Sequence, residues 1–555
     1  MSKIILSLLF SLTLLACDGH DASKTHHAVA SAHPIATQAG IDILNQGGNA
    51  FDAAVAVSAT LAVVEPYSSG MGGGGFWLLH SAKDQTDVMI DGREVAPQKA
   101  HRDMYLDKSG NVIAKISIDG PLSAGIPGQP AALVHINKEY GKLSLQDVFA
   151  PAIKAAQQGF KVSKHYQRMA GFRLEALQAS PAAAEIFLQN NELPEIGYTI
   201  KQADLAKTLA AIADQGFAGF YQGEVAKALV SGTNAAGGIW TAEDLSAYKV
   251  VTRQPLVGQF GQFKVISVAP PSSGGVALIT MLNMLEDRKW STLNLSDRKH
   301  LIIESMRRAY RDRAMYLGDS DFVSVPVTRL TSKAYAKQLA ADIDMSRATA
   351  SNQLPGLDVE AKGNHTTHFS IIDKQGNRVA ATLSVNYPFG SCFVPPGTGI
   401  LLNDEMDDFS AKPGKPNAYG LVGAKANEIQ PGKRMLSSMS PTFIESENKL
   451  AILGTPGGSR IITMVLHSIL NVADGKSAVE VVSAPRFHHQ YLPDEVQYEM
   501  GSISADEANV LVSRGHRLKN INSTYGNMQV IIVDKKENRI TAASDPRGEG
   551  FAIVE

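Results

Sequence analysis

An alternation of apolar and polar residues marks the segment 366–386, beyond the middle of the chain. Apolar positions lead into a polar turn at 373–377 and resume after it, at Phe369, Ile371, Ile372, Val379, Ala381, Leu383 and Val385. This pattern predicts a β-hairpin. A hairpin folded about Gln375 sets Ser384 opposite Thr366 and turns Asn386 to the same face as Ser384. A register slipped by one residue would present the other face.

Helical and strand patterns alternate along the rest of the chain. The segments 36–44 and 50–63 have helical patterns, and the second is so apolar that it is predicted to be buried. Gly47-Gly48 separates them. Residues 450–459 have the pattern of a strand, a tight loop and a helix start, and 529–533 has that of a strand. These patterns predict an α/β (α+β) protein with stacked sheets between helical layers.

The composition indicates a large folded unit. The chain has 555 residues, of which 44% are hydrophobic and 19% charged, so it can bury an extensive core. No linker or low-complexity run divides it. The formal net charge is −2 and no basic cluster occurs, which argues against nucleic acid as a partner.

The N-terminus predicts export. The apolar run 4–16 is too short to span a bilayer and is typical of a secretory signal, which indicates a periplasmic or other extracytoplasmic location. Its end, residues 14–17, resembles a bacterial lipobox in which Cys17 is lipidated, and Asp18 resembles an inner-membrane retention residue. A soluble, cleaved export signal is the alternative. The other cysteine is Cys392, so a lipidated Cys17 leaves no intramolecular disulfide.

Thr366-Thr367-His368 places hydroxyls at the start of the predicted hairpin. Threonine is a poor nucleophile unless a base lies beside it, and the most compact base is its own α-amine, freed by cleavage between His365 and Thr366. On this motif alone, an ordinary polar strand start is the alternative interpretation.

Long motifs in a fixed order carry a resemblance to a known family. They occupy residues 32–34, 38–40, 47–56, 64–66, 69–76, 93–97, 124–128, 366–368, 402–409, 436–441 and 454–460. In these stretches the chain resembles the γ-glutamyltranspeptidase family of N-terminal nucleophile hydrolases, from about His33 to Arg547.

The resemblance implies a four-layer αββα sandwich built from two fragments of one self-cleaving precursor. The expected segments are a signal peptide at 1–17, a large subunit at 18–365 and a small catalytic subunit at 366–555, with the two subunits associated. Thr366 matches the nucleophile, and Ser384 matches a position, commonly Thr, whose hydroxyl bonds the new α-amine.

The resemblance also implies a pocket for a γ-glutamyl group, which carries an α-carboxylate and an α-ammonium. Arg93 matches the arginine that pairs with the carboxylate, assisted by the hydroxyls of Ser437 and Ser438. The residues that match the acceptors for the ammonium are Asn386, Glu405 and Asp408. Gly457 and Gly458 match the oxyanion hole, whose backbone N–H groups stabilise the developing charge. The loop 408–420 matches a lid with Tyr419 as its gate, and its presence favours glutathione-type activity.

Two other signals are discounted. The glycine-rich run 71–75 lacks the lysine of a phosphate loop and the spacing of a dinucleotide fingerprint, so it is expected to allow close backbone packing. His488 and His489 would point to opposite faces of a strand, so they are expected to be structural rather than metal ligands.

The sequence therefore predicts a γ-glutamyl transferase and hydrolase without metal or organic cofactor. Its donors would be glutathione and other γ-glutamyl compounds, and its acceptors amino acids, peptides or water. A glutaryl- or cephalosporin-type acylase of the same fold is the nearest alternative, and a non-catalytic lipid-anchored surface protein is a second one.

Overall fold

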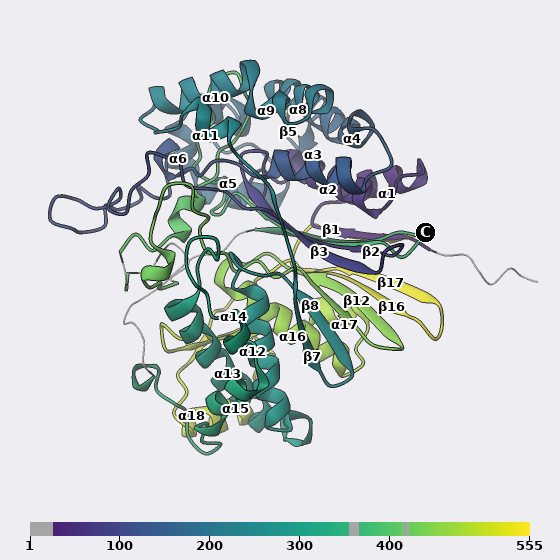
Figure 1. Cartoon of the computed structure of the whole chain (residues 1–555), viewed down its shortest axis with the longest axis vertical. Coiled ribbons are helices and arrows are strands. Elements are labelled where there is room, and N and C mark those ends of the chain that lie inside the picture. The colour runs from purple at the N-terminus through teal and green to yellow at the C-terminus, as the bar shows by residue number, and fades with distance from the viewer. Residues whose placement is uncertain (1–25, 355–365, 413, 416, 418–420) are drawn as a thin grey trace, which may run out of the picture.

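Two antiparallel sheets are stacked at the centre of the molecule (Figure 1). The computed structural model describes residues 26–354, 366–412, 414–415, 417 and 421–555. In spatial order, the first sheet consists of β18 (Phe551–Val554), β1 (Ala28–Ser31), β9 (Thr367–Ile372), β10 (Arg378–Ser384), β2 (Gly74–Ser81), β3 (Thr86–Gly92) and β6 (Val251–Arg253). The second consists of β17 (Arg539–Ser544), β16 (Gln529–Asp534), β12 (Lys449–Gly454), β11 (Thr442–Glu445), β8 (Phe263–Ser267) and β7 (Leu256–Phe260).

Helices cover the outer face of each sheet (Figure 1). The first sheet is covered by α1 (Pro34–Asn45), α2 (Ala50–Val64), α3 (Gln129–Tyr140), α4 (Leu145–Gln158) and, farther out, α5 (Lys164–Phe172), α6 (Leu174–Gln178), α7 (Pro181–Phe187), α8 (Ala203–Gln215), α9 (Ala218–Tyr221), α10 (Gly223–Ala235) and α11 (Ala242–Ser246). The second is covered by α12 (Gly274–Asp287), α13 (Leu295–Tyr316), α14 (Val327–Leu330), α15 (Lys333–Ala341), α16 (Ile461–Ala473), α17 (Ala478–Ser483) and α18 (Ala505–Ser513). This arrangement confirms the predicted αββα layers.

Two small sheets lie outside these layers. One consists of β13 (Phe487–His488), β14 (Val496–Tyr498) and β15 (Leu518–Asn520). The other pairs β4 (Phe160–Lys161) with β5 (Thr199–Ile200).

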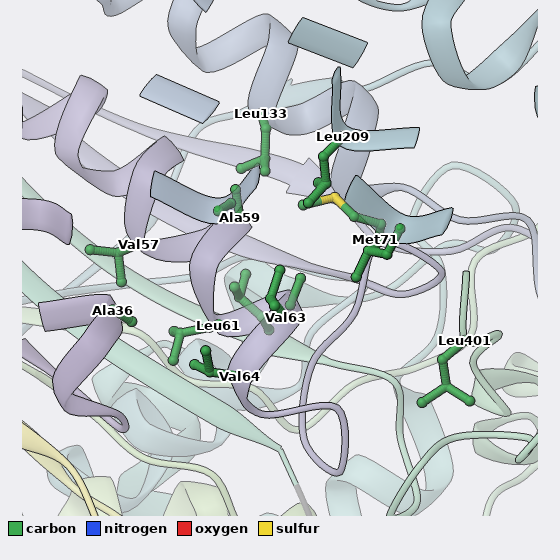
Figure 2. Close-up of a cluster of buried hydrophobic side chains, with 14 of the residues drawn as sticks. Ala36, Val57, Ala59, Leu61, Val63, Val64, Met71, Leu133, Leu209 and Leu401 are labelled. Carbon is green, nitrogen blue, oxygen red and sulfur yellow. The ribbon is translucent and has the colours of Figure 1, made fainter. Parts of the chain in front are cut away.

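Helix α2 is the centre of the first apolar layer. All of its residues are buried, as its uniformly apolar sequence predicts. Its N-terminus is fixed by a capping box, in which the Asn49 side chain accepts from the Asp52 N–H and the Asp52 side chain accepts from the Asn49 N–H. Figure 2 shows its side chains, Val57 and Val63 among them, in one apolar cluster with Leu133 and Leu209 from other helices.

Side chains alternate across β9, and this alternation decides what faces the space between the sheets. Phe369 and Ile371 pack into the core on the helical side, while Ile372 belongs to the core between the two sheets. The Ser370 hydroxyl donates to the Gln529 carbonyl of the second sheet, over 3.1 Å. Thr366, four residues before Ser370, therefore lies on the face that looks toward the second sheet.

The hairpin has the register that the pattern predicts. Leu383 pairs with Thr367 and Arg378 with Ile372, which sets Ser384 opposite Thr366. The prediction for Asn386 needs a refinement, since β10 ends at Ser384 and Asn386 has a φ of +76°. The orientation of Asn386 is therefore fixed by a turn rather than by strand alternation.

The glycine-rich run allows the close packing that was predicted. A Cβ atom on Gly72 would lie 2.1 Å from the Leu401 carbonyl oxygen, and one on Gly73 would lie 2.1 Å from that of Ser384. Only glycine lets the chain pass this close to the strand that carries Ser384.

Several predicted features lie outside the described residues. They are the signal segment with Cys17, then His365, which precedes the proposed cleavage point, and finally Tyr419 of the loop 408–420. Within the described part of the chain, no helix is both long and apolar enough to cross a bilayer. Cys392 is buried and forms no disulfide.

His368 is buried between the sheets, and we expect it to make the fold acid-sensitive. Burial lowers the pKa of its imidazole to about 3, and its ring nitrogens contact the hydroxyls of Thr382 (2.8 Å) and Ser370 (3.3 Å). As pH falls from the unfolded pKa of about 6.5 toward 3, only the unfolded state gains this proton, so stability decreases by about 1.4 kcal/mol per pH unit. The free energy of unfolding, measured with denaturant between pH 4.5 and 7, should therefore depend less steeply on pH in His368→Gln than in wild type. The two slopes should differ by up to about 1.4 kcal/mol per pH unit.

The exposed His101 provides the matched control, because His101→Gln should leave the slope unchanged. An identical slope for wild type and His368→Gln would contradict the assignment of a neutral buried imidazole.

Candidate active site

A pocket opens where the ends of β9 and β10 meet the loops that follow β3 and β12. Most of the residues predicted for the site line it, namely Arg93, Thr366, Ser384, Asn386, Glu405, Asp408, Ser437, Ser438 and Gly458. Leu421, Met439 and Ile461 complete the lining. The fold thus brings together residues that are more than 360 positions apart in the sequence.

Thr366 and Ser384 form the base of the pocket. The hydroxyl oxygens are 3.5 Å apart, and both residues are buried. The Ser384 oxygen also accepts a hydrogen bond from the N–H of Asn386 over 2.7 Å. Either hydroxyl can be the donor between Thr366 and Ser384, and the Ser384 hydroxyl also contacts the carboxyl group of Glu405.

Arg93, which follows β3, forms the centre of a buried charge cluster. Its Nη1 lies 2.5 Å from Glu405 Oε2, and its Nη2 lies 2.6 Å from Asp408 Oδ2. Both carboxylates belong to the short helix η4 (Glu405–Asp408). The residues predicted for opposite ends of a substrate therefore bond to each other in this structure.

A third carboxyl group, that of Glu94, lies 3.5 Å behind the Arg93 guanidinium and is fully buried. Burial, reinforced by the charge of Glu405, raises the pKa of Glu94 well above its ordinary value. Burial also raises the pKa of Glu405, to about 7, although Arg93 opposes this shift. The cluster therefore binds protons near neutral pH and is sensitive to any further charge.

The hydroxyls of Ser437 and Ser438 are held by fixed donors. The Ser437 oxygen accepts from the N–H of Met439 over 3.1 Å, and the Ser438 oxygen accepts from Arg313 Nη2 over 3.1 Å. Arg313 lies in α13 and was not predicted as a site residue. Helix α13 contains several arginines, and no spacing distinguishes this one from its neighbours.

The loop after β12 reaches the pocket at Gly458, whereas Gly457, the other glycine predicted for the oxyanion hole, is not among the lining residues. Gly457 and Gly458 have φ values of +142° and +54°, in the region that favours glycine. A Cβ on Gly457 would lie 2.4 Å from Met464 Cε. The Tyr310 hydroxyl of α13 donates to the Ser459 carbonyl, which holds the loop against the helix.

The described part of the loop 408–420 lies against the pocket. The Asn417 side chain donates to Asp408 Oδ1 over 3.0 Å, and Leu421, the residue after the loop, lines the pocket. Lys412 donates to the Gly110 carbonyl.

The adjacent histidines are buried in polar contacts. His488 contacts Thr463 and Gln490 over 2.9 Å each, and His489 contacts Asp494 over 3.1 Å. Among the residues that the structure describes, no group of three or more His, Cys, Asp or Glu could hold a metal ion.

Comparison with known proteins identifies the family. The sequence model described as Gamma-glutamyltranspeptidase matches residues 36–555. The chain belongs to the γ-glutamyltranspeptidase family. The glutathione hydrolase proenzyme of Escherichia coli (strain K12) is 44% identical to it over 534 residues, which cover 95% of this chain and 91% of that protein.

Solved structures agree with this assignment. A chain of Helicobacter pylori γ-glutamyltranspeptidase is 42% identical to this protein and superposes on it with a TM-score of 0.58. The match covers 59% of this chain and 94% of that one. The cephalosporin acylase from Bacillus halodurans has 26% identity and a TM-score of 0.82, over 95% of this chain and 96% of that one. The family and its fold are therefore those that the motifs indicated.

The proton-binding cluster predicts how Glu405→Gln will behave. Because the pKa of Glu405 is raised in the folded state, its contribution to stability is present at low pH and is lost as pH rises toward about 7. The amide has no such dependence. We therefore expect the thermal midpoint of Glu405→Gln to rise relative to that of wild type as the pH is raised from 5 to 8. The difference between the two midpoints should change by several degrees.

Glu447→Gln, which changes an exposed carboxylate, serves as the control and should show no such trend. A constant difference between Glu405→Gln and wild type across this pH range would mean that Glu405 stays ionised in the folded protein.

Proposed function

We propose that this protein transfers γ-glutamyl groups from glutathione and other γ-glutamyl compounds to amino acids, peptides or water. The observation that carries the proposal is the pocket in which Thr366 lies near Arg93 and the two carboxylates that pair with it, Glu405 and Asp408. A γ-glutamyl donor has both an α-ammonium and an α-carboxylate near the bond to be broken, so it is complementary to groups of both signs.

The two ends of the donor fit different parts of the pocket. Its ammonium would bind the carboxylates of Glu405 and Asp408 and the side-chain oxygen of Asn386. Its carboxylate would bind Arg93 and the hydroxyls of Ser437 and Ser438. Since Arg93 already bonds to Glu405 and Asp408, the donor would join an existing cluster, and its opposite charges leave the total charge of the cluster unchanged.

Thr366 would act after cleavage of the peptide bond between His365 and Thr366. The freed α-amine would take the hydroxyl proton as the Thr366 oxygen attacks the γ-carbonyl carbon of the donor. The negative charge on the carbonyl oxygen would be stabilised by the N–H groups of Gly457 and Gly458. The protonated amine would then pass its proton to the departing amine, leaving a γ-glutamyl ester on Thr366.

The fate of the ester depends on the nucleophile that reaches it. Water would release glutamate, and the amine of an amino acid or peptide would give a new γ-glutamyl amide. The loop 408–420, which bonds to Asp408 through Asn417, is placed to influence this choice, with Tyr419 as its proposed gate. In either case the Thr366 hydroxyl is restored.

The proposed fragments, 18–365 and 366–555, would stay associated after cleavage. In the first sheet, β1 of the larger piece lies between β18 and β9 of the smaller piece, and β2 of the larger piece pairs with β10. In the second sheet, β8 of the larger piece pairs with β11 of the smaller one. Separating the pieces would therefore break both sheets and expose the core between them.

We further propose an extracytoplasmic location, with cleavage of the signal at 1–17 and a lipid anchor on Cys17.

Replacement of the nucleophile tests the central step. Thr366→Ala removes the hydroxyl, so the chain should remain uncut, and release of the amine from a γ-glutamyl anilide should fall by more than about a thousandfold. Intact mass and a chromogenic rate assay measure the two effects. Thr366→Ser keeps a hydroxyl and should still give two fragments that meet at residue 366.

An uncut but active wild type would overturn the amine-activated mechanism. An uncut, inactive wild type would favour a non-catalytic scaffold instead.

An acylase activity is the second candidate, favoured by the likeness to a cephalosporin acylase over nearly the whole chain. A glutaryl group has the carboxylate of a γ-glutamyl group but lacks its ammonium. Because Glu405 and Asp408 would then have no cationic partner from the substrate, we expect kcat/KM for a γ-glutamyl anilide to exceed that for a glutaryl anilide by about 100-fold or more.

Asp408→Asn should narrow this preference by lowering the γ-glutamyl rate more than the glutaryl rate. A wild-type preference for the glutaryl anilide would assign the protein as an acylase.

A further inference from the structure

Arg313 is a second buried guanidinium at the site, and its surroundings differ from those of Arg93. Its Nε donates to the Ser273 hydroxyl over 3.0 Å, and its Nη2 donates to that of Ser438 over 3.1 Å. In the described part of the chain these partners are neutral, and no carboxylate lies within ion-pair distance. Arg93, in contrast, bonds to both Glu405 and Asp408.

The guanidinium of Arg313 keeps its charge at neutral pH. Burial lowers its pKa to about 10, and the field of Asp408 acts in the opposite direction. A buried cation without a paired anion is costly, because its charge is left uncompensated away from water. The charge of Arg313 therefore points to an anionic group in the pocket.

Hydrogen bonding fixes which way the neighbouring hydroxyls point. A serine hydroxyl has one proton and can accept through its oxygen. The Ser438 oxygen accepts from Arg313, and the Ser437 oxygen accepts from the N–H of Met439. Both protons are therefore available for donation into the pocket, where a carboxylate is the complementary acceptor.

Ser273 extends this effect to the second hydroxyl. Its oxygen accepts from Arg313 Nε, and its own proton is donated to the Ser437 carbonyl over 2.7 Å. The backbone N–H of Ser273 donates to the same carbonyl over 2.8 Å. Arg313 thereby holds both the Ser438 side chain and the Ser437 backbone in place.

The charges of the site divide into two regions. Glu405 and Asp408, which both contact Arg93, offer carboxyl oxygens as acceptors, which suits an ammonium. Arg313 contributes one positive charge beside Ser437 and Ser438, which suits a carboxylate. The two regions match the two charged groups of an α-amino acid.

We propose that Arg313 is a positioning and specificity-determining residue for the donor's carboxylate end. It orients the Ser438 hydroxyl as a donor and compensates the charge of the bound carboxylate, which Arg93 cannot do alone while it is bonded to two acids. This inference rests on the proposed γ-glutamyl activity and adds to it the group that fixes the donor's anionic end.

The decisive experiment compares two anilide substrates in the matured enzyme. The γ-glutamyl anilide has both charged groups, and the 4-aminobutanoyl anilide lacks only the α-carboxylate. Arg313→Lys should lower kcat/KM for the first by about 10- to 100-fold, mainly through KM, and change the second by less than about threefold. An equal loss on both substrates would overturn the proposal, because it would indicate a merely structural role.

Arg311→Lys is the matched control, since it alters a largely buried arginine two residues earlier on the same helix, where Arg311 pairs with Asp312. It should affect the rates on both anilides equally or not at all. Intact mass of each variant confirms that it has matured before its rates are compared.

A double-mutant cycle with Ser438→Ala tests whether Arg313 acts through that hydroxyl. If it does, the effects of Arg313→Lys and Ser438→Ala on the γ-glutamyl anilide should be far from multiplicative. Multiplicative effects would overturn the proposed coupling.

The outcome also separates this inference from the proposed function. A wild type that cleaves the glutaryl anilide and not the γ-glutamyl anilide would refute the γ-glutamyl activity. The carboxylate of the glutaryl group would then serve as the probe, and loss of that rate in Arg313→Lys, with the 4-aminobutanoyl rate unaffected, would still uphold the role of Arg313.

Discussion

The pairing of β9 with β10 is the constraint on which the site depends. It holds Thr366 opposite Ser384, and the two strands lie between β1 and β2, so their register cannot shift without disturbing the whole sheet. The close passage of Gly73 over the Ser384 carbonyl fixes the end of the hairpin from the other side. The proposed nucleophile is thereby held on rigid structure, as catalytic geometry requires.

Helix α13 connects three parts of the site with the outer layer. Tyr310 holds the glycine loop through the Ser459 carbonyl, and Arg313, one turn later, holds Ser438. Farther back on the same helix, Glu304 accepts from the N–H of Thr349, in the segment that leads toward the proposed cleavage point. Since a helix is stiff over this length, these contacts keep a fixed spacing.

Strands from before and after the proposed cleavage point lie together in both sheets. Folding must bring the two ends of the chain together before the sheets are complete, since β1 lies between β18 and β9. Cleavage after folding would free an α-amine at a position that the uncut chain has already assembled. The site would therefore form at its final geometry before the nucleophile is activated.

The sequence by itself determined much of this protein. Local periodicity predicted the hairpin and the buried helix α2, because both depend on neighbours along the chain, but it left open a register slipped by one residue. The ordered motifs indicated the family and the residues that the pocket brings together. The sequence did not reveal that Arg93 bonds to Glu405 and Asp408, since those residues are more than 300 positions apart.

Only the tertiary structure decided the electrostatics of the site. Arg307, Arg308 and Arg313 all lie on helix α13. The first two bond to Glu304, whereas Arg313 bonds to neutral hydroxyls. The turn that orients Asn386 likewise depends on the Asp404 carbonyl, to which its side chain donates. Charge and burial depend on what surrounds a side chain in space, and no local pattern in the sequence encodes those long-range neighbours.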